Sequence, residues 1–157
     1  ERLAEPFNLM IEDPVNMGEK SRQIEMMSEL RHRLRTSGLH TVLVADELCP
    51  KFEDHKDFAS SGAADYHQIK VPDLGGIHNA IETVLHLKKT GVGTYLGGSL
   101  AQTIPSARVS VHIGMATRPD QMLACAGLGV NESYSMAFNE MELVLALVRS
   151  KISSKSN

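Results

Sequence analysis

The sequence predicts an α/β protein built on a parallel β-sheet. Five short strand-like runs alternate with five segments whose apolar residues recur at helical spacing. Successive runs lie about 25 to 35 residues apart, which is the length of a strand plus a crossover helix. A closed (β/α)8 barrel needs eight such units and about 250 residues. The 157 residues supply about five units, so we expect part of a barrel.

The composition is that of an ordinary globular domain and excludes several classes of partner. Hydrophobic residues make up 42% and charged residues 22%, and the net charge is -3. This charge provides no basic face for nucleic acid. No apolar run approaches the ~20 residues that span a bilayer, so no membrane partner is expected. Two cysteines form no disulfide framework, which makes the cytoplasm the simplest expected location.

The first two predicted strands both end on acidic residues. An apolar run over 6–11 ends on Glu12, and a continuous apolar, β-branched run over 41–45 ends on Asp46. Asn16 is expected to cap the intervening helix, whose apolar residues recur every three or four positions until Gly38 ends it.

The third predicted strand, residues 66–70, ends on Lys70. Pro72 cannot donate to a sheet ladder, so the strand must stop at about this point. Gly75 and Gly76 then indicate a loop into the next helix. A lysine at the carboxyl end of a buried strand is well placed for chemistry, although a surface lysine at a strand end would show the same pattern.

The remaining elements follow the same alternation. Residues 99–117 fit either a strand or a helix, and we favour a helix because strands and helices have alternated up to that point. Residues 1–150 are expected to form the barrel portion, and residues 151–157 a disordered tail. The other predicted strands are 93–96 and 121–124, and the other predicted helices are 52–60, 77–89 and 133–150.

Glu12, Asp46 and Lys70 should gather at one end of the sheet, because parallel strands share their carboxyl ends. Two carboxylates form a hard oxygen pair suited to Mg²⁺. A lysine near a divalent cation has its pKa lowered towards that of a working base. Such a set could remove a proton next to a carboxylate and stabilise the enediolate that results. Each residue alone also has the simpler explanation of a polar strand end.

Six blocks of residues occur in the order and register of one known family. They are Pro6-Phe7 with Ile11-Glu12-Asp13-Pro14, Val44-Ala45-Asp46-Glu47 with Cys49, Gln68 through Gly76, Tyr95 with Gly97-Gly98, Gly127-Leu128-Gly129 and Asn139-Glu140-Met141. Over about residues 5 to 148 the chain thus resembles methylaspartate ammonia-lyase, of the enolase superfamily. The resemblance implies barrel strands four to eight of such an enzyme.

The resemblance also implies a role for each site residue. Glu12 and Asp46 would be two of three Mg²⁺ ligands, and Lys70 would take the C3 proton of (2S,3S)-3-methylaspartate before ammonia leaves to give mesaconate. The implied substrate contacts are a carboxylate bound by Gln68, Ser99 and the Leu100 N–H, and a methyl group bound by Tyr95 and Leu123.

The sequence departs from the family at three places. The family's Thr-Cys-Asn-Glu is Ser-Leu-Ala-Gln over residues 99–102, Cys125 begins the block where the family has Lys-Pro-Gly-Met-Gly, and Asn131 replaces an aspartate. The third metal ligand and a partner histidine would lie on strands outside this chain. We therefore expect a homo-oligomer or a partner supplying the amino-terminal half of the enzyme.

Other functions remain open at this stage. The chain could be a subunit of a split enzyme, a non-catalytic partial barrel, or a related epimerase or cycloisomerase. The seven histidines show no recognisable ligand spacing, so no histidine metal site is expected. Cys49 follows a strand without an assignable base and is expected to be a buried thiol.

Overall fold

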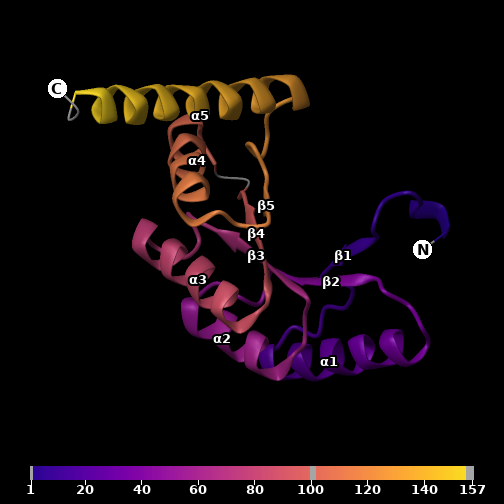
Figure 1. The fold of residues 1–157 in the computed structure, drawn as a ribbon. Coiled ribbons are helices and arrows are strands. Elements are labelled where there is room, and N and C mark those ends of the chain that lie inside the picture. The colour runs from indigo at the N-terminus through magenta and orange to yellow at the C-terminus, as the bar shows by residue number, and fades with distance from the viewer. Residues whose placement is uncertain (1, 100–101, 155–157) are drawn as a thin grey trace.

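Strands and helices alternate through almost the whole chain in the computed structural model, which describes residues 2–99 and 102–154 (Figure 1). The strands are β1 (Met10–Glu12), β2 (Val42–Ala45), β3 (Tyr66–Lys70), β4 (Gly93–Gly97) and β5 (Gln121–Met122). The helices are α1 (Lys20–Thr36), α2 (Phe52–Ser61), α3 (Ile77–Thr90), α4 (Ile104–Thr117) and α5 (Val130–Ser153), preceded by a short 3-10 turn over Arg2–Ala4.

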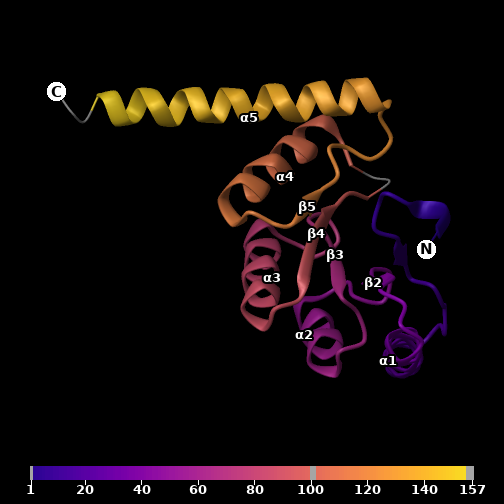
Figure 2. The same ribbon diagram turned by 45° about the vertical axis from the view of Figure 1, so that its right-hand side comes forward.

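The five strands form one parallel sheet in the order β1-β2-β3-β4-β5. Helices α1 to α4 follow the outer face of this sheet, and α5 crosses beyond α4 and projects away from it (Figure 2). Each strand thus lies beside its predecessor after one helical crossover, which confirms the predicted parallel βα array. The helix predicted within residues 99–117 is confirmed as α4, whose first turn is capped by the Thr103 hydroxyl.

Two apolar clusters fill the space between the sheet and its helices. One joins β3 and β4 to α3 through Ile69, Leu96 and Val84. The other joins β2 to α1 and α2, with Leu43 and Phe58 at its centre. Successive residues of a strand point to opposite faces. Ile69 points towards the helices, so Gln68 and Lys70 point to the inner face of the sheet.

Two predicted element ends were wrong for local reasons. Glu19, not Asn16, caps α1, because its carboxylate accepts the N–H groups of Ser21 and Arg22, whereas Asn16 accepts from Gly18. The first strand begins at Met10 rather than at Pro6 because the Phe7 N–H closes a turn onto the Ala4 carbonyl.

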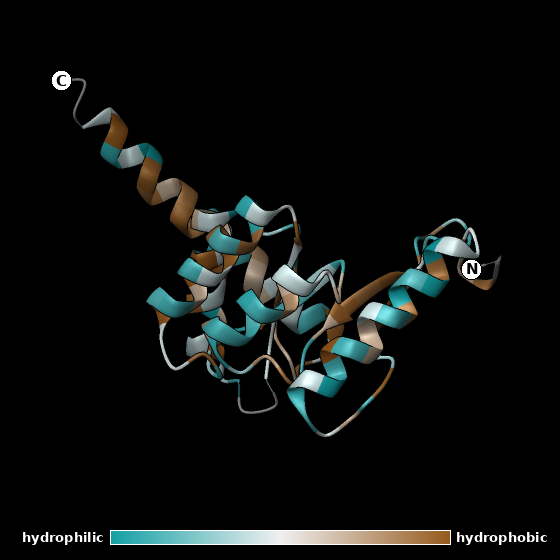
Figure 3. Ribbon diagram, turned by 90° about the horizontal axis from the view of Figure 1, so that it is seen from below, coloured by the Kyte–Doolittle hydropathy of each residue, from teal (hydrophilic) through white to brown (hydrophobic). Residues whose placement is uncertain are grey.

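The tail predicted from residue 151 is helical as far as Ser153, and residues 155–157 lie outside the described part of the chain. Lys151 suits the negative end of the helix dipole, which helps α5 to continue. Several apolar residues of this projecting helix are exposed, among them Leu147, Val148 and Ile152. Figure 3 shows hydrophobic residues recurring along the same helix. Within the described residues no helix is both long and apolar enough to cross a membrane.

Asp65 fastens α1 to the sheet from its position just before β3. Its carboxylate accepts from Arg31 at 2.7 Å, from Arg35 at 2.8 Å and from the Leu43 N–H at 2.9 Å. Burial alone would raise the pKa of Asp65, but these three donors outweigh burial and lower it.

We expect Asp65→Ala to reduce the free energy of unfolding by about 2 kcal/mol, because charge-assisted hydrogen bonds of this kind are lost. Since the folded-state pKa is lowered, the stabilisation is present above the ordinary aspartate pKa of about 4 and is lost as the pH falls through the folded-state value. Urea denaturation at neutral and acid pH measures both effects. Glu29→Ala, which breaks the exposed Glu29–Arg33 pair of α1, is the control and should change stability by less than about 1 kcal/mol. Equal losses in the two variants would contradict the role of Asp65.

Candidate active site

The side chains at the ends of β1, β2 and β3 meet at the carboxyl edge of the sheet. Glu12 ends β1 and pairs in register with Val44, Asp46 follows β2 directly, and Lys70 ends β3. The Lys70 ammonium lies 2.8 Å from an Asp46 carboxylate oxygen. On the adjacent position of the same face, the Gln68 amide donates to Glu12 over 2.6 Å. The structure thus brings together the four polar residues that the sequence assigned to strands β1 to β3.

Two acids that the sequence reasoning left without a role complete this group. Glu47 pairs with Lys70 at 2.9 Å, and the Glu47 side chain is largely exposed. Asp13 accepts the backbone N–H groups of Asp46 at 3.2 Å and Glu47 at 2.8 Å. Asp13 therefore joins the end of β1 to the start of the loop after β2. The available signal was the double acid at both strand ends, Glu12-Asp13 and Asp46-Glu47.

The electrostatics of the group are those of crowded carboxylates. Burial raises the pKa of Asp46 to about 7, and the negative charges of Glu12 and Glu47 act in the same direction, against the opposing effect of Lys70. Burial alone would lower the pKa of Lys70, but its bonds to Asp46 and Glu47 raise the pKa above the ordinary lysine value. Lys70 is therefore protonated in the arrangement described, with 15% of its side chain exposed.

Oxygen atoms of carboxylates in this arrangement are the class of donor that Mg²⁺ prefers. Burial, and to a smaller extent the charges of Glu12 and Glu47, makes ionised Asp46 unfavourable, and a cation beside it would offset that cost. Glu12 is held by Gln68, which is the kind of supporting bond that orients a metal ligand. The residues present thus fit a magnesium ion, which Glu12 and Asp46 would hold.

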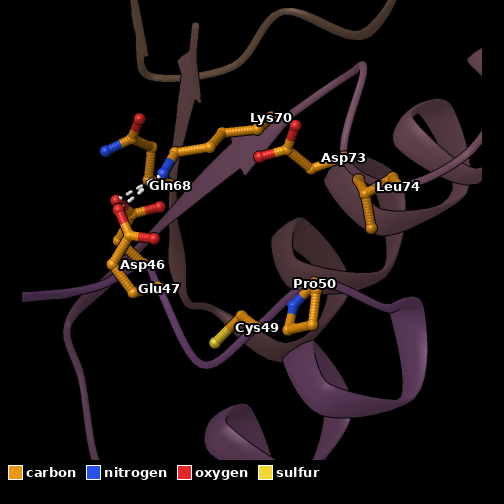
Figure 4. Close-up of a pocket in the computed structure, with 8 residues that line it drawn as sticks. All are labelled: Asp46, Glu47, Cys49, Pro50, Gln68, Lys70, Asp73 and Leu74. Carbon is orange, nitrogen blue, oxygen red and sulfur yellow. Dashed lines mark hydrogen bonds and ion pairs between the residues drawn. The ribbon is translucent and has the colours of Figure 1, made fainter. Parts of the chain in front are cut away.

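A small pocket opens beside this group and is bordered by the loops after β2 and β3 (Figure 4). Its lining residues are Asp46, Glu47, Cys49, Pro50, Gln68, Lys70, Asp73 and Leu74. Cys49 is buried, as the sequence predicted. Lys70 and Asp46 therefore both border this pocket.

Three of the other residues predicted to bind substrate lie on or shortly after β4 and β5. Tyr95 pairs in register with Gln68, and its pKa is raised by burial and then by the charges of Glu12 and Asp46, so its phenol lies near the acids. Ser99 and Leu123 follow β4 and β5 at the same end of the sheet.

Leu100, the remaining predicted substrate contact, lies outside the described residues.

Comparison with known proteins agrees with this geometry. Residues 1–150 match the family model described as the methylaspartate ammonia-lyase C-terminus. The chain is 49% identical, over 93% of its length, to methylaspartate ammonia-lyase 2 of Carboxydothermus hydrogenoformans. The chain belongs to the methylaspartate ammonia-lyase family. It covers 35% of that relative, so it spans about a third of the length of the curated proteins it matches.

Solved structures extend the comparison to the fold. A magnesium complex of β-methylaspartase from Clostridium tetanomorphum is 42% identical with a TM-score of 0.87, covering 96% of this chain and 36% of that one. The Citrobacter amalonaticus methylaspartate ammonia-lyase containing (2S,3S)-3-methylaspartic acid is 40% identical with a TM-score of 0.89. The match covers 94% of this chain and 36% of that one. A muconate cycloisomerase variant shares the fold alone, since it is 23% identical with a TM-score of 0.56. That match covers 67% of this chain and 26% of the variant. The chain itself therefore has the fold of the carboxyl-terminal part of an enolase-superfamily (β/α)8 barrel.

Gly97 allows Gln68 to reach Glu12, because a Cβ atom at Gly97 would collide with the Gln68 side chain. We expect Gly97→Ala to lower stability by about 1–3 kcal/mol through this overpacking. The double variant Gly97→Ala with Gln68→Ala removes the collision and should regain part of the loss. Chemical denaturation of the four proteins of this cycle measures the coupling. Purely additive losses would show that Gly97 matters for another reason.

Proposed function

We propose that this chain provides the general base and two metal ligands of a methylaspartate ammonia-lyase site. The observation that carries the proposal is the contact between Lys70 and Asp46 at 2.8 Å, beside a Glu12 carboxylate held by Gln68. The Citrobacter relative, whose structure contains (2S,3S)-3-methylaspartic acid, supports the choice of substrate class. A 3-substituted aspartate presents a carboxylate next to an acidic C–H bond, which suits this set of groups.

Lys70 would act as the base that accepts the C3 proton. Its ammonium must first lose a proton, and the nitrogen lone pair then takes the C3 proton while the C–H electron pair moves into the adjacent carboxylate. That electron pair forms the C2–C3 double bond when the C2–N bond breaks. The amine leaves from C2 as ammonia, and the remaining carbon skeleton is mesaconate. Bound Mg²⁺ would stabilise the negative charge that develops on the neighbouring carboxylate and, as a nearby like charge, would favour neutral Lys70.

The remaining inner-face residues would position the substrate. Gln68 can donate to a substrate carboxylate as well as to Glu12, and Ser99 together with the Leu100 N–H would complete that contact. Tyr95 and Leu123 would form the apolar wall around the methyl group. Support for Tyr95 comes from its place beside Gln68 and near the acids.

A complete site would require groups from outside these residues. Two carboxylates hold Mg²⁺ weakly, since this ion gives up its water reluctantly and prefers octahedral coordination. Strands β1 and β5 end the described sheet and offer edges to which further barrel strands can be added. We propose that an amino-terminal portion of the enzyme, linked or separate, supplies the third ligand and the partner histidine, and that the assembled protein is a homo-oligomer.

For the chain by itself we expect weak Mg²⁺ binding and no measurable deamination of methylaspartate. Isothermal titration with Mg²⁺ and an assay for mesaconate absorbance test the two statements. Addition of the amino-terminal portion of a close relative should increase both binding and turnover. Full activity of the isolated chain would contradict the proposed division of the site. A folded complex that binds Mg²⁺ but never acts on methylaspartate would favour a related epimerase or a non-catalytic barrel.

In the assembled protein we expect Lys70→Ala to slow C3 hydrogen exchange by at least about 100-fold while Mg²⁺ binding remains, because lysine is the base and not a ligand. Asp46→Ala should lose both exchange and metal binding. Deuterium incorporation followed by NMR measures the exchange. Lys89→Ala, at an exposed position on α3, is the control and should behave as wild type. Full exchange in Lys70→Ala would make the lysine structural and overturn the assignment.

A further inference from the structure

A second group of ligand-type side chains lies outside the proposed active site, against the helices. Cys49 comes from the loop after β2, His55 from α2 and His67 from β3. One ligand atom from each residue lies within 4.8 Å of the ligand atoms of the other two. His67 neighbours Gln68 in sequence, but alternation along the strand directs it to the opposite face. The carboxylates proposed to hold magnesium are not part of this group.

The two histidines are in direct contact and fully inside the protein. Their Nδ1 atoms are 3.1 Å apart, and their exposed fractions are 1% for His55 and 0% for His67. The Phe58 ring packs edge-on against His67. Burial lowers the pKa to about 4 for His55 and to about 3 for His67, where the neighbouring His55 acts in the same direction. Both rings are therefore neutral at pH 7, and neutral imidazole is the form that binds metals.

The hydrogen bond between the rings leaves His67 incompletely satisfied. The Nε2 atom of His67 is buried and has no hydrogen-bond partner among the described residues. If His67 donates from Nδ1, its Nε2 lone pair is unused, and if it accepts at Nδ1, its Nε2 hydrogen is unused. Two apolar side chains would fill this space without burying unpaired polar atoms. The histidine pair therefore carries a free-energy cost that apolar side chains at these positions would avoid.

The third member, Cys49, is 4% exposed. Burial raises the pKa of its thiol, and the nearby carboxylates, Asp13 first among them, act in the same direction. The thiol is therefore protonated in the arrangement described. A cation that binds the sulfur would remove that proton, as metal ions do with coordinating thiols.

We propose that Cys49, His55 and His67 form a binding site for a borderline-soft divalent cation of the zinc class. Sulfur and imidazole nitrogen suit zinc or cobalt, whereas magnesium prefers oxygen. Three protein ligands leave a fourth tetrahedral position open. With metal–nitrogen bonds of about 2.0–2.1 Å, two nitrogen ligands of a tetrahedral site lie ~3.3 Å apart. The Nδ1 separation of 3.1 Å is already close to that value.

The protons balance on binding. The metal–sulfur bond forms as the Cys49 S–H bond breaks, and that proton passes to solvent. The hydrogen shared between the two Nδ1 atoms moves to the Nε2 atom of the ring that carried it, so each neutral ring presents its Nδ1 lone pair to the cation. The Nε2 hydrogen of His67 then has no partner among the described residues. One proton is released for each cation bound, and no oxidation or reduction occurs.

Cobalt(II) titration of the chelator-treated chain tests the proposal. We expect a thiolate-to-cobalt charge-transfer band in the near ultraviolet that added zinc removes and that excess magnesium leaves unchanged. Cys49→Ser should abolish the band and weaken zinc binding roughly 100-fold or more, since even supporting residues around a metal cost about 10–100-fold when lost. Cys125→Ser changes the other buried cysteine and is the matched control, expected to keep the band.

The Cys125→Ser protein decides the outcome even if Cys49→Ser does not fold, because the chain contains two cysteines. A band that survives Cys125→Ser comes from Cys49. His67→Gln should then weaken cobalt binding and reduce the tetrahedral visible bands. The proposal is overturned if wild type shows no charge-transfer band, or if the band depends on Cys125. Cobalt binding without that band would show that the ion is not bound by Cys49 and would equally overturn it.

Discussion

The parallel register of β1, β2 and β3 is the constraint on which both groups of polar residues depend. Pairing of Glu12 with Val44 and of Ala45 with His67 brings the three carboxyl ends to one edge. Alternation along β3 then divides its side chains between two faces. The inner face receives Gln68 and the outer face His67. A shift of one residue in this register would exchange the two faces and dismantle both groups.

Charge balance stabilises the inner group. Lys70 neutralises part of the charge of Asp46 and Glu47, and Gln68 donates to Glu12. Burial of the Asp46 carboxylate is nevertheless unfavourable, which is expressed in its raised pKa. Carboxylates with a raised pKa are common at functional sites, where binding or catalysis requires them. In the outer group, by contrast, the histidines are neutral, and the unfavourable feature is the buried, unpaired Nε2 atom of His67.

The two groups suit cations of different chemistry, although they lie on opposite faces of the same strand, β3. Oxygen donors on the inner face fit a hard ion, and nitrogen and sulfur donors on the outer face fit a softer one. Cys49 lies between them, since it lines the pocket beside Lys70 and also belongs to the histidine group. The loop after β2 therefore connects both, because Asp46 and Cys49 are three residues apart within it.

The sequence by itself determined the βα alternation, the parallel sheet and the family, because periodicity, glycine breaks and ordered motifs are local signals. It also indicated that Glu12, Asp46 and Lys70 share an edge, since parallel strands end together. Only the tertiary structure decided that Glu47 also binds Lys70 and that His55 meets His67. Those contacts depend on how a loop folds back and how α2 packs on β3. Neither leaves a spacing rule in the chain, so the histidine pair could not be predicted.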